Sequence, residues 1–252
     1  MSRTALITGA SSGIGAATAR AFAASHIHLI ICGRRTERLE ELKRELEPQV
    51  KVHVLTFDVA DYESVKNAIE SLPEEFSRID ILVNNAGNAH GLGPIHEGDL
   101  NDWTQMINSN VIGLLNVSKC LMKRMTERGS GHIVNISSVA GKHVYENGGV
   151  YCATKHSVEA ISEAMRKDLT AYGVKVTNIA PGAVETEFSL VRFKGDQERA
   201  GKVYEGFEPL QAGDIADAIA YCVNAPEHVT IADMTIYAKA QSYPTTIYRN
   251  PK

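Results

Sequence analysis

The segment Thr8-Gly9-Ala10-Ser11-Ser12-Gly13-Ile14-Gly15 decides the fold of this chain. It follows a short apolar run, Ala5 to Ile7, and leads into an alanine-rich stretch that ends near Ala24, so we predict a strand, a glycine turn and a helix. In such a turn, backbone N–H groups and the positive end of a helix dipole can meet a pyrophosphate, and the glycines leave room for its approach. The spacing is Gly-x-x-x-Gly-x-Gly instead of the more common Gly-x-Gly-x-x-Gly, so a purely structural turn stays an alternative.

The alternation of strand and helix patterns predicts the rest of the fold. Strands are expected near residues 4–8, 28–32, 51–57, 80–84, 131–137, 174–180 and 233–237. Helical patterns lie between them, which favours a Rossmann-type α/β fold, a doubly wound parallel sheet of about seven strands with helices on both faces. The length of 252 residues suits one such domain, spanning residues 1–252.

The end of the second predicted strand indicates which dinucleotide the chain prefers. An NAD-binding chain usually has an acidic residue there, which accepts hydrogen bonds from the ribose 2′-hydroxyl. This chain has Arg34 and Arg35 there, and no carboxylate occurs before Glu37. Guanidinium groups can bind a 2′-phosphate bidentately, so the sequence favours NADP. The alternative is that both arginines are solvated residues at the start of the helix predicted from residue 37 to 47.

Tyr151 and Lys155 form the candidate chemical centre. On a helix, residues at i and i+4 project from one face, so the Lys155 ammonium is expected near the Tyr151 phenol. A positive charge about 4 Å away at an effective dielectric near 20 would favour the phenolate by roughly 4 kcal/mol before desolvation, which would make Tyr151 a general acid and base. Alone, the same spacing fits a surface helix with a solvated lysine. Likewise, Ser138 alone fits a strand-end hydroxyl that caps a turn.

Other polar residues follow predicted strands. The segment 80–87 is an apolar run that ends in Asn84-Asn85-Ala86-Gly87, the segment 131–138 ends in two serines, and the segment 174–180 leads into Pro181-Gly182. Ligands of open parallel sheets bind at the carboxyl ends of the strands. These residues are therefore expected to meet at one edge of the sheet.

Over essentially its whole length the chain resembles the short-chain dehydrogenase/reductase family. The residues that carry the resemblance are Thr8, Gly9, Gly13, Gly15, Asp58, Asn84, Asn85, Ala86, Gly87, Asn110, Ser138, Tyr151, Lys155, Pro181, Gly182 and Thr186. The resemblance implies a catalytic set of Asn110, Ser138, Tyr151 and Lys155, with Asp58 at the adenine, Thr186 at the nicotinamide carboxamide, and Asn110 holding a water linked to Lys155. The expected NADP-binding residues are Gly9, Ser11, Ser12, Gly13, Ile14, Gly15, Arg34, Arg35, Asp58, Val59, Asn85, Ala86, Gly87, Tyr151, Lys155, Pro181, Gly182, Val184 and Thr186.

Residues 184–196 and Gln241-Ser242 are similar to the branch of NADP-dependent 3-hydroxy acid dehydrogenases. This finer resemblance implies a small acid such as L-serine, L-allo-threonine or 3-hydroxypropionate, or the matching semialdehyde, as substrate. Ser138 and Tyr151 would contact the reacting oxygen, and Arg192 would bind the carboxylate, unless Arg192 forms a salt bridge within a mobile lid. Two other functions stay open, a reductase of bulkier ketones or acyl thioesters and a non-catalytic NADP-binding regulator.

Composition excludes several classes of function. With 26 Lys and Arg against 30 Asp and Glu, the net charge is -4, which gives no support to nucleic-acid binding. No Cys-x-x-Cys or His-Glu-x-x-His spacing occurs, so no metal site is expected. Met1 leads almost directly into the first strand and no apolar run approaches a membrane span, so a cytoplasmic protein without membrane contact is expected. Residues 187–212 are expected to form a substrate lid, and the family resemblance implies a homotetramer. The tail from Gln241 either covers a neighbouring subunit or is free.

Overall fold

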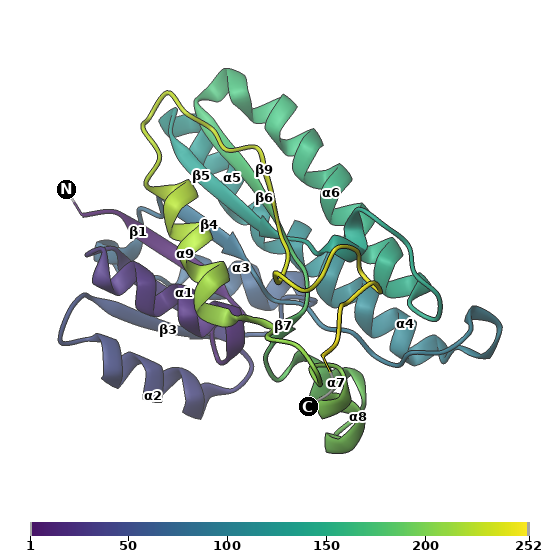
Figure 1. Cartoon of the computed structure of the whole chain (residues 1–252). Helices are drawn as coiled ribbons and strands as arrows, with labels where there is room; N and C mark the ends of the chain where they lie inside the picture. The colour runs from purple at the N-terminus through teal and green to yellow at the C-terminus, as the bar shows by residue number, and fades with distance from the viewer. Residues whose placement is uncertain (1, 251–252) are drawn as a thin grey trace.

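The computed structural model describes residues 2–250, and its centre is a seven-stranded sheet in the order β3-β2-β1-β4-β5-β6-β9 (Figure 1). Every neighbouring pair of strands is parallel. The strands are β1 (Thr4–Thr8), β2 (His28–Gly33), β3 (Val52–Thr56), β4 (Ile81–Asn84), β5 (Gly131–Ile136), β6 (Val174–Pro181) and β9 (Asp233–Ile236). The predicted doubly wound parallel sheet is confirmed, and its strands differ from the prediction only at their ends.

Helices cover both faces of this sheet, as Figure 1 shows. One layer contains α1 (Gly13–Ala24), α2 (Thr36–Leu46) and α9 (Ala212–Val223), and the other contains α3 (Tyr62–Glu70), α5 (Gly113–Arg128) and α6 (Gly149–Leu169). Shorter elements lie toward the site, and they are η2 (Ile95–Glu97), α4 (Leu100–Ile107), the π-helical turn η3 (Asn108–Ile112), η4 (Val139–Gly141), β7 (Val184–Glu185), α7 (Phe188–Arg192), α8 (Gln197–Lys202) and β8 (Leu210–Gln211). The remaining short turns are η1 (Glu74–Phe76) and η5 (Thr170–Tyr172).

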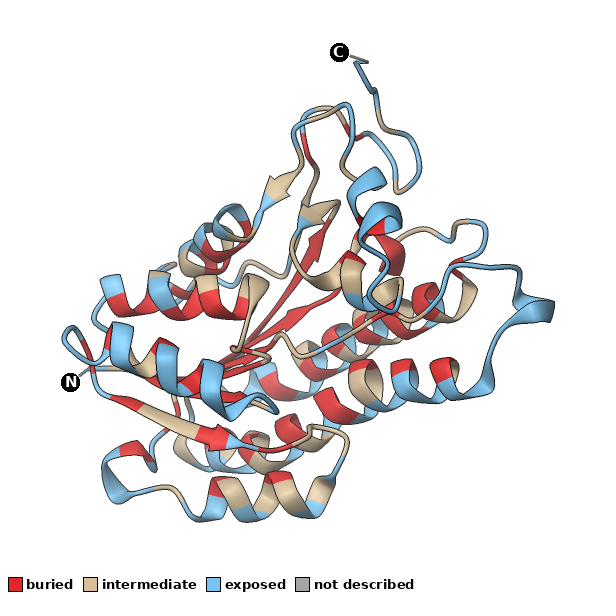
Figure 2. Ribbon diagram, turned by 90° about the horizontal axis from the view of Figure 1, so that it is seen from below, coloured by how far each residue is buried: buried red, intermediate tan, exposed pale blue. Residues whose placement is uncertain are grey.

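The core forms because strand residues alternate between the two helical layers. In β1, Ala5 and Ile7 pack with α1, α2 and α9, whereas Leu6 packs with α3, α5 and α6. Figure 2 shows the buried residues concentrated in the strands and on the helix faces that point toward them. Burial on both faces accounts for the nearly continuous apolar runs in the sequence, because a parallel sheet covered on both sides has no solvated face.

The strand order reverses between β1 and β4, and this reversal creates the site. From β1, the chain first adds β2 and β3 on one side and then β4, β5 and β6 on the other. The connections after β1 and after β4 consequently diverge and leave a crevice at the carboxyl ends of these strands. The glycine turn and the Asn85-Ala86-Gly87 segment, which were predicted to meet, both begin at this crevice.

Candidate functional site

The Thr8 side chain joins the glycine turn to the end of β4. Its hydroxyl donates a hydrogen bond to the carbonyl of Val83 at 3.3 Å and accepts hydrogen bonds from the backbone N–H groups of Asn85 and Ala86, each at 3.0 Å. Gly9 has φ of 66°, and a Cβ at this position would lie 2.9 Å from Ala86 Cα. A side chain at Gly9 would therefore be strained in its backbone and would also collide with the neighbouring loop.

The turn itself presents a surface without large side chains at the start of α1. A Cβ on Gly15 would lie 2.5 Å from the Gly9 carbonyl oxygen, and one on Gly13 would lie 3.3 Å from Thr186 Cγ2. Ser12, the residue before α1, makes no side-chain capping bond, so the first N–H groups of this helix keep their capacity to bind an anion. These features fit the phosphates of a dinucleotide. Gly9, Gly13, Gly15 and the neighbouring Ile14 would form the cradle, with Thr186 on its far side.

The arginines predicted to bind a 2′-phosphate lie beside this turn. Arg35 donates hydrogen bonds to the hydroxyls of Ser11 and Ser12 at 2.6–3.1 Å. Arg34 is mostly exposed, and its Nη1 lies 3.5 Å from Oδ2 of Asp58. All five side chains thus lie around the end of β2, where the 2′-position of an adenosine ribose is expected.

Two further charged residues, which no sequence pattern indicated, belong to this cluster. Glu187 accepts hydrogen bonds from Arg35 Nη1 at 2.8 Å and from Arg38 Nη1 at 2.6 Å. These two hydrogen bonds and the charges of both guanidinium groups hold the pKa of the Glu187 carboxyl at about 2. Glu187 is therefore ionised throughout the physiological pH range.

The other predicted cofactor residues also lie along the crevice. The Val59 carbonyl accepts a hydrogen bond from Asn116 at 2.9 Å, and the Asn85 amide donates to the carbonyls of Thr8 and Gly9. Gly182 donates its backbone N–H to Ile236 at 2.7 Å. Gly87 lies in the loop after β4, Pro181 is the last residue of β6, and Val184 is the first residue of β7.

Tyr151 and Ser138 meet at the carboxyl end of β5. Tyr151 lies in the first turn of α6 and is only 8% exposed. The Ser138 hydroxyl accepts a hydrogen bond from the Ala140 N–H at 3.1 Å and interacts with the Tyr151 phenol, which favours the phenolate. Because Tyr151 comes from a helix and Ser138 from a strand end, only the tertiary fold brings these two hydroxyls together.

The predicted effect of Lys155 on Tyr151 is not what the structure shows. Burial raises the pKa of the Tyr151 phenol above its ordinary value, and the nearby Tyr145 adds to this increase. The cation that opposes the increase is Arg192, together with the hydrogen bond from Ser138. The prediction was wrong because it considered only the attraction between the Lys155 ammonium and the Tyr151 phenolate. Desolvation has the largest effect on the pKa of this buried phenol.

Lys155 instead points toward the backbone at the end of β5. Its Nζ donates a hydrogen bond to the Ile136 carbonyl at 2.9 Å. A Cβ on Gly87 would lie 3.6 Å from this Nζ, so the amine borders the Asn85-Ala86-Gly87 loop as well. Burial lowers the pKa of the Lys155 ammonium to about 8, and Glu159 partly opposes the shift. Lys155 can consequently gain or lose a proton near neutral pH.

Asn110 lies in the π-helical turn η3, between α4 and α5. Its amide nitrogen donates to the Asn88 carbonyl at 2.8 Å and to Thr154 at 3.0 Å, and its amide oxygen accepts from the Asn88 N–H at 2.8 Å. These contacts fix the loop after Gly87 against α6. Single π-helical turns often occur at functional sites, and this one aims Asn110 at the same region as Lys155.

Arg192 packs on the face of the Tyr151 ring. Its guanidinium carbon is 4.8 Å from the Tyr151 ring centroid and 5.4 Å from that of Phe188, and its Nη2 donates to the Tyr145 hydroxyl at 2.8 Å. Among residues 2–250 Arg192 makes no ion pair, so the alternative of a salt bridge within the lid is not found. Its Nε is buried and has no hydrogen-bond partner in the described part of the chain.

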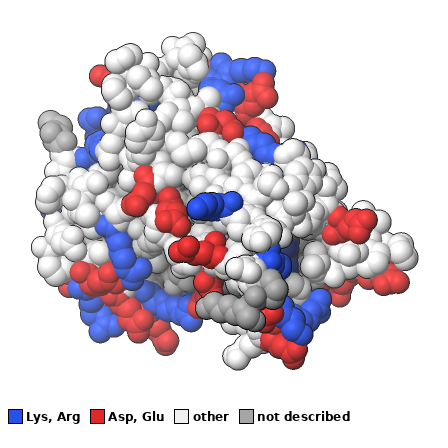
Figure 3. All heavy atoms as spheres, in the orientation of Figure 1, with Lys and Arg blue, Asp and Glu red and all other residues white. Residues whose placement is uncertain are grey.

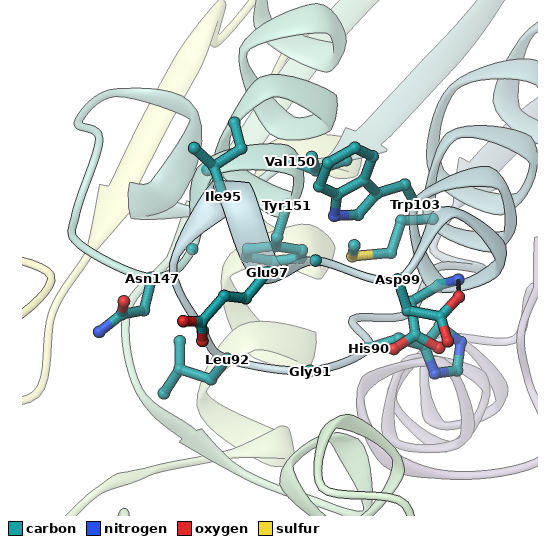
Figure 4. Close-up of a pocket in the computed structure, with 16 residues that line it drawn as sticks. His90, Gly91, Leu92, Ile95, Glu97, Asp99, Trp103, Asn147, Val150 and Tyr151 are labelled. Carbon is teal, nitrogen blue, oxygen red and sulfur yellow. Dashed lines mark hydrogen bonds between the residues drawn. The ribbon is translucent and has the colours of Figure 1, made fainter.

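A cavity of about 210 Å³ adjoins Tyr151. Figure 4 shows Trp103, Ile95, Glu97, Leu92 and Asn147 arranged around Tyr151. The loop 90–99 supplies most of one wall, and α4 and the start of α6 supply the rest. Ile95 is largely exposed at this wall, so the cavity has an apolar rim at its opening.

The segment 187–212 is attached at several points to the rest of the chain. Lys194 pairs with Asp102 of α4 at 2.9 Å, and the Arg192 carbonyl accepts a hydrogen bond from the Gly91 N–H at 2.9 Å. On its outer side, Arg249 of the tail donates hydrogen bonds to the carbonyls of Val203 and Glu205. The tail thus folds back on its own segment 203–206, which differs from the free tail that was one alternative.

No sequence pattern indicated three residues that contact the candidate site, namely Arg38, Glu187 and Tyr145. Each acts through a partner that is distant in the sequence or lies in another loop, so no periodicity identifies it. Glu187 directly follows Thr186, and this position was the one available signal.

Within residues 2–250, no cluster of three or more His, Cys, Asp or Glu side chains has an arrangement suited to a metal ion. The helices described there are also too short or too polar to cross a membrane. On the face shown in Figure 3, basic and acidic side chains are interspersed, in keeping with the small net charge.

The chain is similar to known proteins in both sequence and structure. Residues 3–196 match the model of the short chain dehydrogenase family. The chain belongs to this family. It is 44% identical to sulfoacetaldehyde reductase 2 of Chromohalobacter salexigens, over 96% of this chain and 97% of the relative. It is 40% identical to the NADP-dependent 3-hydroxy acid dehydrogenase of Schizosaccharomyces pombe, over 98% and 96% of the two chains. The closed form of a serine dehydrogenase complexed with NADP+ superposes with a TM-score of 0.92 at 40% identity, over 98% of this chain and 100% of that one.

The buried Lys155 of this short-chain dehydrogenase predicts a specific pH dependence of stability. Below pH 8, Lys155 is charged in both the native and the unfolded chain, and its burial destabilises the native state. Between pH 8 and 10.5 the unfolded chain binds more protons than the native chain, so the free energy of unfolding rises with pH. Relative to Lys155→Met, the wild-type protein should gain about 2 kcal/mol between pH 7 and pH 9.5, as measured by urea unfolding. A difference between the two proteins that does not vary with pH would contradict the assigned shift.

Proposed function

We propose that this chain is an NADP-dependent oxidoreductase that transfers hydride between the cofactor and a small 3-hydroxy acid, or the matching semialdehyde. The observation that carries the proposal is the contact between Tyr151 and Ser138 at the end of β5, together with Lys155 one turn later on α6 and a glycine turn that fits a dinucleotide. Bound NADP supplies or accepts the hydride at its nicotinamide ring. The protein supplies the proton and holds the reacting oxygen.

Tyr151 is the proton donor and acceptor in this proposal. Its raised pKa keeps the phenol protonated at neutral pH, which is the state required to donate a proton to a carbonyl oxygen during reduction. In the oxidative direction the phenol must first lose its proton. Arg192 and Ser138 favour this loss, because both stabilise the phenolate.

Ser138 and Lys155 assist by different routes. The Ser138 hydroxyl lies within reach of the same substrate oxygen and can stabilise the charge that develops on it. Lys155, with a pKa near 8, can relay a proton between the interior and the polar loop at Asn110. The arginines at the end of β2, held by Ser11 and Ser12, would bind the 2′-phosphate that distinguishes NADP from NAD.

The size of the cavity and the position of Arg192 support a small acid as the substrate. About 210 Å³ is smaller than the cavities that bind drug-sized ligands, so it suits a short substrate. Arg192 keeps a buried N–H without a hydrogen-bond partner among the described residues and lies against Tyr151, where it could bind an acid group next to the reacting carbon. The names of the relatives support this substrate class, because sulfoacetaldehyde, a 3-hydroxy acid and serine all contain an acid group.

Removal of the Tyr151 hydroxyl tests the catalytic assignment. Tyr151→Phe should lower kcat at least about 100-fold, because positioned proton transfer contributes roughly that much or more. NADPH binding, followed by the fluorescence of the bound nicotinamide, should stay nearly unchanged. Tyr172→Phe, a variant of an exposed tyrosine on η5, is the matched control. More than a few per cent of residual activity in Tyr151→Phe would refute the assignment.

A second substitution tests recognition of the acid group. Arg192→Leu should raise the KM for 3-hydroxy acids about 10- to 100-fold, the loss expected for a hydrogen bond to a charged group, and affect small neutral alcohols far less. Arg199→Leu is the control, since Arg199 lies in the same segment and stacks on Phe193 at 4.6 Å. Equal losses for acids and alcohols would remove the recognition role.

We further propose that the protein assembles as a homotetramer, through the face formed by α5 and α6. A hollow of about 390 Å³ between these helices is lined mainly by apolar side chains, among them Leu115, Met122, Ile161 and Met165. An apolar groove of this kind on a helical layer is typical of a subunit contact. The mass in solution, measured by light scattering, should be about four times that of the chain, and Leu115→Glu should lower it.

A further inference from the structure

Glu187 begins the lid, and its carboxylate crosses to the opposite wall of the cofactor crevice. The two carboxylate oxygens accept hydrogen bonds from different residues, Oε1 from Arg38 at 2.6 Å and Oε2 from Arg35 at 2.8 Å. Both arginines lie at the start of α2, far from Glu187 in the sequence. The contact therefore links the start of the lid to the start of α2, two segments that are far apart in the sequence.

The contact completes a ring of residues around the glycine turn. Arg35 is fixed from its other side by the hydroxyls of Ser11 and Ser12. Thr186, the residue before Glu187, packs its methyl group against Gly13. Starting from the turn, the ring runs through Arg35 to Glu187 and returns through Thr186.

We propose that Glu187, Arg35 and Arg38 form a latch that holds the lid closed over bound NADP and so limits the rate at which the coenzyme is released. This inference rests on the proposed function, since it requires NADP to bind at the turn. Glu187 and Arg38 act here as positioning residues. They add no group to the chemistry at Tyr151.

The exposure of the three side chains supports a latch that opens readily. Arg35, Arg38 and Glu187 are each between 40% and 46% exposed, so a single ion pair among them would contribute little. Two guanidinium groups that share one carboxylate, one of them already fixed by serine hydroxyls, make a stronger network than an isolated pair. A contact of intermediate strength suits a lid that must open once in each turnover.

The rival interpretation gives Glu187 the opposite effect. If the carboxylate merely occupied Arg35 and Arg38 in competition with the 2′-phosphate, its removal would free both arginines for the cofactor. NADPH would then bind more tightly and leave more slowly, and NADH, which has no 2′-phosphate, would be unaffected. The two interpretations thus predict opposite signs for NADPH.

Glu187→Gln separates these cases, because it removes the charge and keeps the size of the side chain. We expect release of NADPH and of NADH, followed by stopped-flow fluorescence, to be about three- to tenfold faster than in the wild-type protein. Hydrogen exchange of residues 187–195 should also be faster in the cofactor-free variant. Added salt should accelerate NADH release from the wild-type protein and have little effect on the variant, because the contact is ionic.

Glu198→Gln provides the matched control. Glu198 lies in the same segment and, among the residues that the structure describes, pairs only with Lys202, its neighbour on α8, at 2.5 Å, so its loss should change neither release nor exchange. Unchanged or slower NADPH release in Glu187→Gln would overturn the latch, as would an equal effect of Glu198→Gln. A wild-type protein that binds no NADPH would instead contradict the proposed function itself.

Discussion

The close approach of two backbone segments at the carboxyl ends of β1 and β4 is the constraint on which the site depends. Gly9 lies against Ala86, Gly15 lies against the Gly9 carbonyl, and the Thr8 hydroxyl ties the two loops together. No side chain fits between these segments, so the crevice has a floor made of backbone. That floor offers N–H groups to an anion, and it places the loop after β4 next to Lys155.

Burial affects the pKa values of the two candidate catalytic groups, Tyr151 and Lys155, more than neighbouring charge does. Tyr151 and Lys155 are both almost inaccessible, and desolvation shifts their pKa values in opposite directions, upward for the phenol and downward for the ammonium. Each shift favours the neutral form of the group. In the proposed mechanism, a protonated phenol and a readily deprotonated amine are the two components of the proton path, and burial favours both.

The sequence was sufficient for the sheet, because short apolar runs such as Ala5 to Ile7 alternate with helical patterns along most of the chain. It was also sufficient to place Ser138 and the glycine turn after strand ends and Tyr151 and Lys155 on one helix, although their proposed roles stay predictions. It was not sufficient for the pKa of Tyr151, which burial and the nearby Tyr145 raise and Arg192 lowers. The pairing of Glu187 with Arg35 and Arg38 was equally hidden, because it joins residues from separate halves of the sheet.

The two ends of the chain lie in different parts of the molecule. Arg3 and the start of β1 lie at the amino edge of the sheet, away from the crevice, whereas Arg249 and Asn250 hydrogen-bond to the backbone of residues 203–206. Figure 1 shows this separation of the two ends. A fusion partner or purification tag at the amino end would therefore be remote from the crevice, while one at the carboxyl end would lie next to residues 203–206 of the segment proposed as the lid.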